Sequence, residues 1–164
     1  MSVDATLLIP ELWQAWQELA LRLAASSGIV YKPYLGYRDP SLQAALYAKY
    51  QAGGPRAAPP WSSAHQWGLA IDVEAYLDGT AASWQDADYK PLIDALNAHP
   101  TLASGASFHD ADHIELRYPP GPWDARVLGV LPKLYASELV TRAWPLVRIM
   151  IARTSGTTVQ EDGG

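Results

Sequence analysis

The sequence contains no cysteine, which excludes disulfide bonds and thiolate metal ligands. Any metal must therefore be held by histidine and carboxylate side chains. Charged residues make up only 18% of the chain, the net charge is −5, and the lysines and arginines are scattered, so nothing indicates a nucleic-acid-binding surface. Phenylalanine occurs once, against seven tryptophans and nine tyrosines. Tryptophan and tyrosine often line wet grooves that bind peptides or sugars, although most of those here are expected in the core.

Long apolar runs are absent as well. Residues 1–5 lack the basic start and the apolar core of a signal peptide. The most apolar late stretch, 134–152, contains Glu138, Arg142 and Arg148, which argues against a membrane span. The 164 residues have the length of one ordinary domain, and 49% of them are apolar, so the chain can bury a core.

Helices and strands are mixed without a regular βαβ alternation, which indicates an α+β fold. The first helix is the clearest element: Pro10 suits its first turn, Gly28 ends it, and one face carries apolar residues at helical spacing. These apolar residues are Leu12, Trp16, Leu19 and Leu23. The other expected elements are a strand over 29–36, a helix over 39–52, a strand over 69–74, a helix over 89–98, and a turn leading into a strand over 107–116.

An imidazole and a carboxylate lie seven positions apart near the middle of the chain. His65 leads into the predicted strand, and Asp72 lies on the polar face of that strand because apolar residues alternate with it. Gly68 between them is expected to let the backbone turn close to a metal. Further on, His113 follows Asp110 by three residues. Two histidines and one aspartate make a three-ligand zinc site with an open fourth position, so His65, Asp72 and His113 are the candidate ligands.

A carboxylate beside the open position could act as general base on the bound water. Asp110 is the candidate, because a turn before His113 would bring it to the metal. Asp112 is a rival, but it adjoins a ligand and is expected to face away. Arg38, just after the first predicted strand, is the candidate to stabilise the oxyanion of a tetrahedral intermediate. Glu115 is expected to hold a ligand histidine from behind rather than to bind the metal.

Each of these residues taken alone has an ordinary structural interpretation. A histidine in a strand is commonly a satisfied core or surface residue, and Asp72 could cap a turn. The remaining histidines fit such roles: His99 precedes a proline and is expected to cap a helix end, and His109 is expected to point away from the side on which Asp110 lies. Only the joint spacing of the two motifs favours a metal site.

The two spaced motifs resemble the signature of the LAS-type zinc peptidases. This superfamily includes D-alanyl-D-alanine carboxypeptidases, D-Ala-D-Ala dipeptidases and phage L-alanyl-D-glutamate endopeptidases. The motifs read Ser63-x-His65-x-x-Gly68-x-Ala70-x-Asp72 and Asp110-x-x-His113. The resemblance covers residues 8–118 and is closest to the phage endolysin branch, which also has aspartate rather than glutamate three residues before the last histidine. The segments similar to that branch are Gly36-Tyr37-Arg38, 43–48 and 107–116.

The resemblance implies a fold, a cofactor and a substrate. The implied fold is a small antiparallel sheet packed by helices, the LAS/hedgehog-like peptidase fold, and the implied cofactor is Zn²⁺. The implied substrate is the stem peptide of bacterial peptidoglycan, with Asp110 as the base, Arg38 on the oxyanion or on a substrate carboxylate, and Ser63 near the substrate. The zinc ligands implied are His65, Asp72 and His113.

Three functions are open. The branch favours an L-alanyl-D-glutamate endopeptidase, either an endolysin released from the host cytoplasm to the cell wall by a holin or a virion-associated enzyme. A D-Ala-D-Ala carboxypeptidase is the alternative within the same chemistry. Segments 53–62 and 102–106 are expected at the substrate groove and depart from the family, so the bond that is cleaved stays open: the first lacks the family's glycine-threonine segment and the second lacks its tryptophan. The third function is a non-catalytic zinc module that binds cell wall or a partner, and Asp110 argues against it because binding needs no base.

The expected division of the chain has three parts. Residues 1–118 form the zinc peptidase core, 119–153 a helical C-terminal extension, and 154–164 a flexible tail. The extension is rich in apolar residues, which favours packing on the core or on a partner. Through 123–153 the chain could associate with itself or with a phage tail component.

Overall fold

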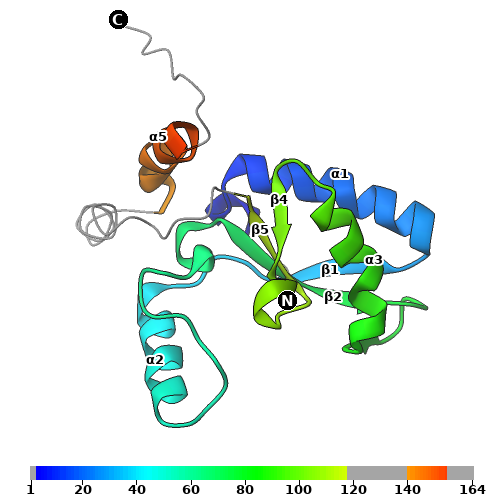
Figure 1. Cartoon of the computed structure of the whole chain (residues 1–164), viewed down its shortest axis with the longest axis horizontal. Helices are drawn as coiled ribbons and strands as arrows, with labels where there is room; N and C mark the ends of the chain where they lie inside the picture. The colour runs from blue at the N-terminus through cyan, green and yellow to red at the C-terminus, as the bar shows by residue number, and fades with distance from the viewer. Residues whose placement is uncertain (1–2, 118–139, 155–164) are drawn as a thin grey trace, which may run out of the picture.

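The computed structural model describes residues 3–117 and 140–154, and the structural statements below refer to these residues. They form an antiparallel sheet of five strands in the order β1-β2-β5-β4, with β3 paired to β2, together with four helices (Figure 1). The predicted α+β class and the small antiparallel sheet are confirmed. The strands are β1 (Val30–Leu35), β2 (Ala70–Tyr76), β3 (Ala82–Ser83), β4 (Leu102–Ser104) and β5 (His113–Leu116). The helices are α1 (Pro10–Ser27), α2 (Pro40–Gln51), α3 (Asp86–Asn97) and α5 (Trp144–Thr154), with short 3-10 turns η1 (Ala5–Leu7), η2 (Ala64–Trp67), η3 (Gly105–Phe108) and η4 (Val140–Ala143).

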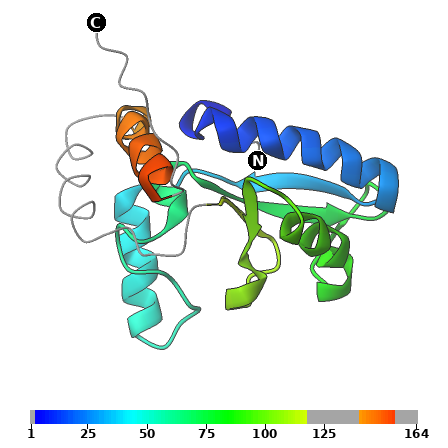
Figure 2. The same cartoon turned by 45° about the horizontal axis from the view of Figure 1, so that its top comes forward.

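Helix α1 covers one face of the sheet and fills the core. Its first residue is Pro10, and it ends at Gly28, which adopts a left-handed conformation (φ 73°) and donates its N–H to the carbonyl of Ala24. The helix contacts β1, β4 and β5 and lies along the sheet in Figure 2. The predicted apolar face is the buried one: Leu12, Trp16, Leu19 and Leu23. This helix leaves the opposite face of the sheet available for the polar side chains.

Strand β2 is central, because it pairs with β1, β3 and β5. In its antiparallel register with β5, Asp72 lies directly opposite His113. On the other side of β2, Leu35 at the end of β1 also pairs with Asp72, after a register shift. Directly opposite side chains in an antiparallel pair lie within about 5.5 Å at Cβ. The pairing alone therefore places the second and third candidate ligands side by side.

Gly68 joins η2 to β2 in a left-handed conformation (φ 67°). A Cβ at this position would lie 2.3 Å from the carbonyl oxygen of Leu7. The carbonyl of Gly68 accepts a hydrogen bond from the N–H of Ile9 at 2.9 Å. The glycine was expected to allow a close approach to a metal; the backbone that comes close is instead that of the N-terminal segment.

Several elements differ from the sequence expectations. Strands β3 and β4 were missed, since strands of two and three residues are stabilised by pairing rather than by a local pattern. Helix α3 begins at Asp86, whereas the sequence predicts its start at residue 89. The acidic residues of its first turn resemble a polar connection in the sequence, but they are favourable at a helix N-terminus. On α2, Leu42 is exposed, and the buried residue is Gln43.

The described C-terminal residues are helical and pack on the core, near the start of α1 (Figure 2). The side chain of Arg148 forms an ion pair with Glu11 of α1. The buried side chains of this C-terminal segment are Val140, Ala143, Trp144 and Val147. The predictions for 118–139 and for the tail 155–164 lie outside the described residues. No helix within 3–117 or 140–154 has both the length and the apolar composition of a membrane span.

Candidate metal centre and its cleft

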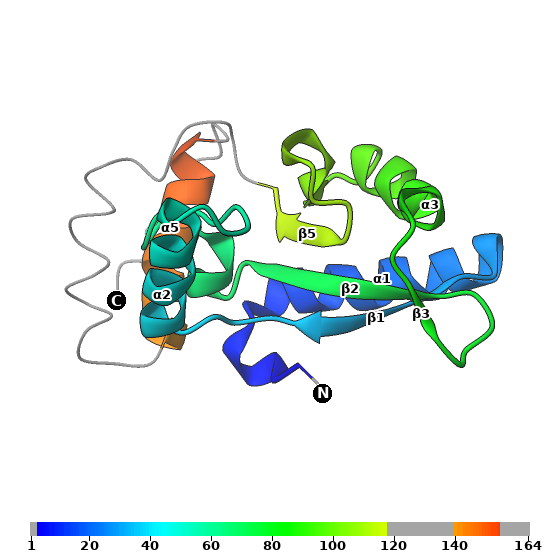
Figure 3. The same ribbon diagram turned by 90° about the horizontal axis from the view of Figure 1, so that it is seen from below.

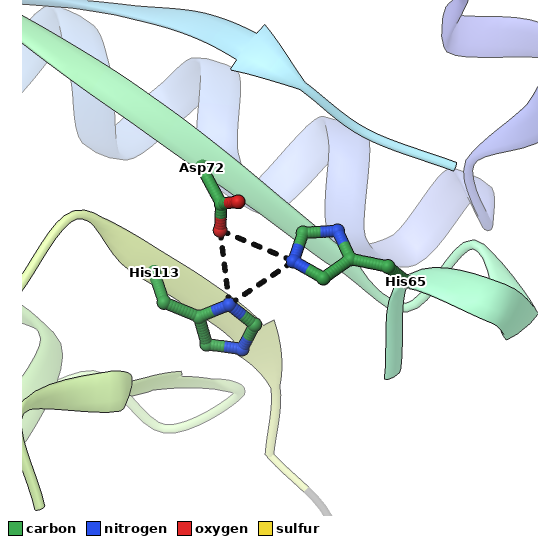
Figure 4. A group of neighbouring side chains, drawn as sticks. All are labelled: His65, Asp72 and His113. Carbon is green, nitrogen blue, oxygen red and sulfur yellow. Dashed lines mark hydrogen bonds and ion pairs between the residues drawn. The ribbon is translucent and has the colours of Figure 1, made fainter. Parts of the chain in front are cut away.

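His65, Asp72 and His113 converge from three elements, η2, β2 and β5 (Figure 4). Nε2 of His65 lies 3.1 Å from Oδ1 of Asp72 and 3.2 Å from Nδ1 of His113. Nδ1 of His113 lies 3.0 Å from the same Oδ1. With bonds of about 2.0–2.1 Å to a tetrahedral ion, ligand atoms are about 3.3 Å apart. The three side chains thus already stand at nearly the mutual spacing of zinc ligands, and they could hold a metal ion.

The outward nitrogen of each imidazole is held by an acceptor. Nδ1 of His65 donates to the carbonyl of Gly36 at 2.8 Å, which leaves the Nε2 lone pair directed at the centre. Nε2 of His113 donates to Oε2 of Glu115 at 3.1 Å, so its Nδ1 faces the centre and offers a lone pair there once the ring is neutral. Metal-binding histidines characteristically donate their other N–H to a carbonyl or a carboxylate. Glu115 therefore lies behind His113, at the ring nitrogen that faces away from the other two candidate ligands.

Burial and charge also suit a cation. All three side chains are buried. Burial opposes ionisation of Asp72, but the close contacts with His113 and His65 hold the pKa of this carboxyl well below its usual range. Burial alone would lower the pKa of His113, yet its hydrogen bonds to Asp72 and Glu115 raise it to about 9. The donor set of two imidazoles around one carboxylate oxygen fits zinc.

We expect zinc affinity to rise with pH, by about tenfold per unit up to pH 9, because zinc must displace the proton on His113. The raised pKa stabilises the metal-free fold below the usual histidine value of 6.5, and this contribution is lost as pH rises to about 9. The chelator-treated protein should therefore melt at lower temperature at pH 9 than at pH 6.5. Calorimetric titration in two buffers would count the protons released by zinc. An affinity that does not change with pH would contradict this charge arrangement.

A cleft of about 710 Å³ opens over the three ligands. Its lining residues come from α2 and the loop that follows it, and from η3 and the turn before β5. Figure 3 shows the ribbons of α2 and β5 apart from each other, with α2 at the left of the view. Ser63, Arg38 and Asp110 all line it. His109 lines it too, although it was expected to point away. The chain is not extended there: His109 adopts a left-handed conformation (φ 64°).

Asp110 rather than Asp112 faces the cleft. Burial, a hydrogen bond with Asp112 and the nearby charge of Asp72 raise the pKa of Asp110 to about 7. Such a value is suited to a base that works near neutral pH. Oδ2 of Asp112 accepts a hydrogen bond from the hydroxyl of Tyr34 at 2.7 Å, which turns this carboxylate toward β1.

Arg38 contacts two of the candidate metal ligands, His65 and Asp72. Its backbone N–H donates to the carbonyl of His65 at 3.0 Å, and its Nη2 lies 4.0 Å from Oδ2 of Asp72. Its Nη1 donates to Oε1 of Gln43 at 2.9 Å, and Nε2 of Gln43 donates to the carbonyl of Ala58 at 2.7 Å. Gln43 is fully buried. No role for Gln43 is predicted from the sequence, where the signal is an amide five residues after Arg38 on the predicted helix.

Gly105 is a second position that the sequence analysis missed. A Cβ there would lie 2.6 Å from the carbonyl oxygen of Asp110 and 2.7 Å from Cβ of His113. Its carbonyl accepts a hydrogen bond from the N–H of Asp110 at 3.2 Å. The absence of a side chain lets the turn with the candidate base fold against a candidate ligand.

A Gly105→Ala substitution is expected to destabilise the fold by about 1–3 kcal/mol through overpacking. The backbone of Asp110 and the side chain of His113 must move to admit the new methyl group, so zinc affinity should also fall. Denaturant unfolding and a zinc titration would measure the two effects. Wild-type values for both would contradict the packing described here.

Comparisons with known proteins identify the family of the chain and solved structures with a similar fold. The model of the VanY family, described as D-alanyl-D-alanine carboxypeptidase, matches residues 6–123. No curated protein matched the sequence. The fold is similar to that of the L-Ala D-Glu endopeptidase ChiX of Serratia marcescens (TM-score 0.52, 22% identity, covering 70% of this chain and 84% of that one). It is also similar to the vancomycin resistance D,D-pentapeptidase VanY of a VanB-type cassette, solved as a mutant in complex with Zn(II) (TM-score 0.50, 21% identity, covering 66% and 72%). The chain belongs to the VanY D-alanyl-D-alanine carboxypeptidase family of LAS-type metallopeptidases.

Proposed function

We propose that this protein is a zinc-dependent peptidase that cleaves the stem peptide of bacterial peptidoglycan at the L-alanyl-D-glutamate bond. The observation that carries the proposal is the convergence of His65, Asp72 and His113 in a cleft that Asp110 also lines. Family membership supports peptidase chemistry, and it argues against the non-catalytic zinc module.

His65, Asp72 and His113 would hold the zinc. When bound there, Zn²⁺ would polarise the scissile carbonyl and lower the pKa of an attacking water to about 7. Gly36 and Glu115 keep the two imidazoles in the orientation that such binding needs, through the hydrogen bonds described above.

The other cleft residues would handle protons and charge. Asp110 would take the proton of the attacking water and later deliver it to the leaving amine, since it lines the cleft with a pKa near neutrality. Arg38 would stabilise the oxyanion, or bind a substrate carboxylate, with its guanidinium held by Gln43. Ser63, at the cleft wall, would contact the substrate.

The choice of the L-alanyl-D-glutamate bond rests on separate arguments from the peptidase chemistry. An aspartate three residues before the last histidine is the spacing of the endopeptidase branch, and the endopeptidase of Serratia marcescens has a similar fold. The alternative, a D-Ala-D-Ala carboxypeptidase, is favoured by the description of the matching family. Both substrates present carboxylates, and both Arg38 and Arg56 line the cleft.

Mass spectrometry of the products from purified peptidoglycan separates the two reactions. The endopeptidase releases fragments that begin with D-glutamate and leaves L-alanine on the glycan. Loss of terminal D-alanine alone would contradict the endopeptidase and support the carboxypeptidase. Release of neither product by zinc-loaded protein would contradict both.

The domain division and the biological setting stay predictions. We infer a catalytic core over 1–118 and a helical extension over 119–153. Delivery as a phage endolysin through a holin, as a virion component, or through a tail partner rests on the resemblance to the phage branch alone.

A further inference from the structure

We propose that Trp144 of the C-terminal helix is a positioning residue for the metal centre, because it holds the turn that carries His65. The inference rests on the proposed function, since it treats His65 as a ligand. Trp144 lies beyond residues 6–123, the part of the chain that matches the family. It would make the C-terminal helix part of the catalytic unit rather than an appendage.

The contact is a buried hydrogen bond to the end of η2. The indole Nε1 of Trp144 donates to the carbonyl of Trp67 at 2.9 Å. The side chain of Trp67 is fully buried, and Trp144 is 8% exposed. A buried carbonyl that loses its donor pays its desolvation penalty, so the bond favours one position of the turn.

Turn η2 has little rigidity of its own. It is a single 3-10 turn of four residues, Ala64–Trp67, and short 3-10 segments have poor hydrogen-bond geometry. Its internal bonds include one from Gly68 N–H to the carbonyl of His65 at 3.3 Å. The position of His65 must therefore be fixed by contacts from outside the turn.

Those outside contacts surround the turn. Arg38 binds the carbonyl of His65, and Ile9 binds the carbonyl of Gly68. The carbonyl of Trp67, next to that of Gly68, is bound by Trp144. Three of the four carbonyls over 65–68 are thus bound from outside the turn, by the segment after β1, by the N-terminal segment and by the C-terminal helix.

Trp67, which Trp144 holds, also contacts the loop at the cleft wall. The indole of Trp67 donates to the carbonyl of Trp61 at 3.2 Å, and the two rings lie 5.7 Å apart. Trp61 follows the cleft-lining residues 56–59. Movement of Trp67 would therefore disturb both His65 and the loop opposite η3.

The rest of the helix provides a matched control. Arg148 pairs with Glu11 at the start of α1, and this ion pair is partly exposed. It joins the same helix to the core without touching η2. If zinc affinity depended only on the docking of the helix, Arg148→Gln would lower it as well. If it depends on the hydrogen bond from Trp144 to η2, Arg148→Gln would leave it unchanged.

The experiment compares wild type, Trp144→Phe and Arg148→Gln as full-length chains. Phenylalanine keeps an aromatic ring but removes the N–H. Zinc affinity is measured by competition with a chromophoric chelator, and amide hydrogen exchange at Gly68 and Leu69 is measured in chelator-treated protein. Direct hydrogen-bond partners of metal ligands contribute about 10- to 100-fold to affinity. Trp144 acts on His65 through Trp67, so we expect a loss at the low end of this range, about tenfold weaker zinc binding in Trp144→Phe. Exchange at the two amides should be faster in this variant, and Arg148→Gln should match wild type in both measurements.

Wild-type affinity and exchange in Trp144→Phe would overturn the inference. An equal loss in Arg148→Gln would also overturn it, because docking alone would then explain the effect. Absence of zinc binding in the wild type would instead overturn the proposed function, and the exchange measurement would still decide whether Trp144 holds the turn.

Discussion

Replacing Asp110 with alanine is expected to lower kcat by about 10²- to 10⁴-fold, the usual contribution of a general base, while the chain keeps its zinc. The expectation follows from the position of Asp110, which lines the cleft with the three ligands but lies outside the group that could hold the metal. Metal analysis and single-substrate kinetics on the same preparation would measure both quantities.

Asp112→Asn is the control for this variant. Asp112 is two residues away and is also an aspartate, but its carboxylate binds Tyr34. It also shares a hydrogen bond with Asp110, so Asp112→Asn is expected to shift the pH profile of kcat rather than to remove the base. We expect a much smaller loss of kcat in Asp112→Asn than in Asp110→Ala. The opposite order would assign the base to Asp112, the rival that the sequence analysis left open.

Replacing His65 with alanine is expected to remove zinc binding, from about one ion per chain in the wild type to almost none, and to remove peptidase activity with it. Two donors would remain, Asp72 and His113, and they already hydrogen-bond each other. The readout is zinc content after dialysis against dilute chelator, together with the melting temperature.

His99→Ala is the matched control for His65→Ala. Nδ1 of His99 accepts hydrogen bonds from the backbone N–H groups of Thr101 and Leu102. Burial and the nearby Arg22 and Arg117 lower its pKa, which favours the neutral ring that accepts these hydrogen bonds. His99→Ala should keep its zinc. Zinc loss in both variants would indicate global unfolding rather than removal of a ligand.

The local features of the fold could be predicted from the sequence. The buried face of α1 follows from the spacing of four apolar residues, and its two ends follow from Pro10 and Gly28. The convergence of His65, Asp72 and His113 could be expected only from the spacing of two motifs, and the register of β2 with β5 is what brings the last two together.

Features that depend on tertiary packing could not be predicted. Gly105 is required by the backbone of Asp110 and the side chain of His113, and no local pattern marks such a glycine. Gln43 is buried because it binds Arg38 and the loop beyond α2, although amides are usually exposed on helices. The contact between Trp144 and Trp67 joins residues 77 positions apart.

The most direct test of the account is cleavage of purified peptidoglycan by one preparation in three states: zinc-loaded, treated with a chelator, and reloaded with zinc. Fragments from cleavage within the stem peptide are expected to appear in the first state, disappear in the second and return in the third. Cleavage that continues after complete removal of the metal would contradict the account, as would the absence of cleavage by protein that holds one zinc ion per chain.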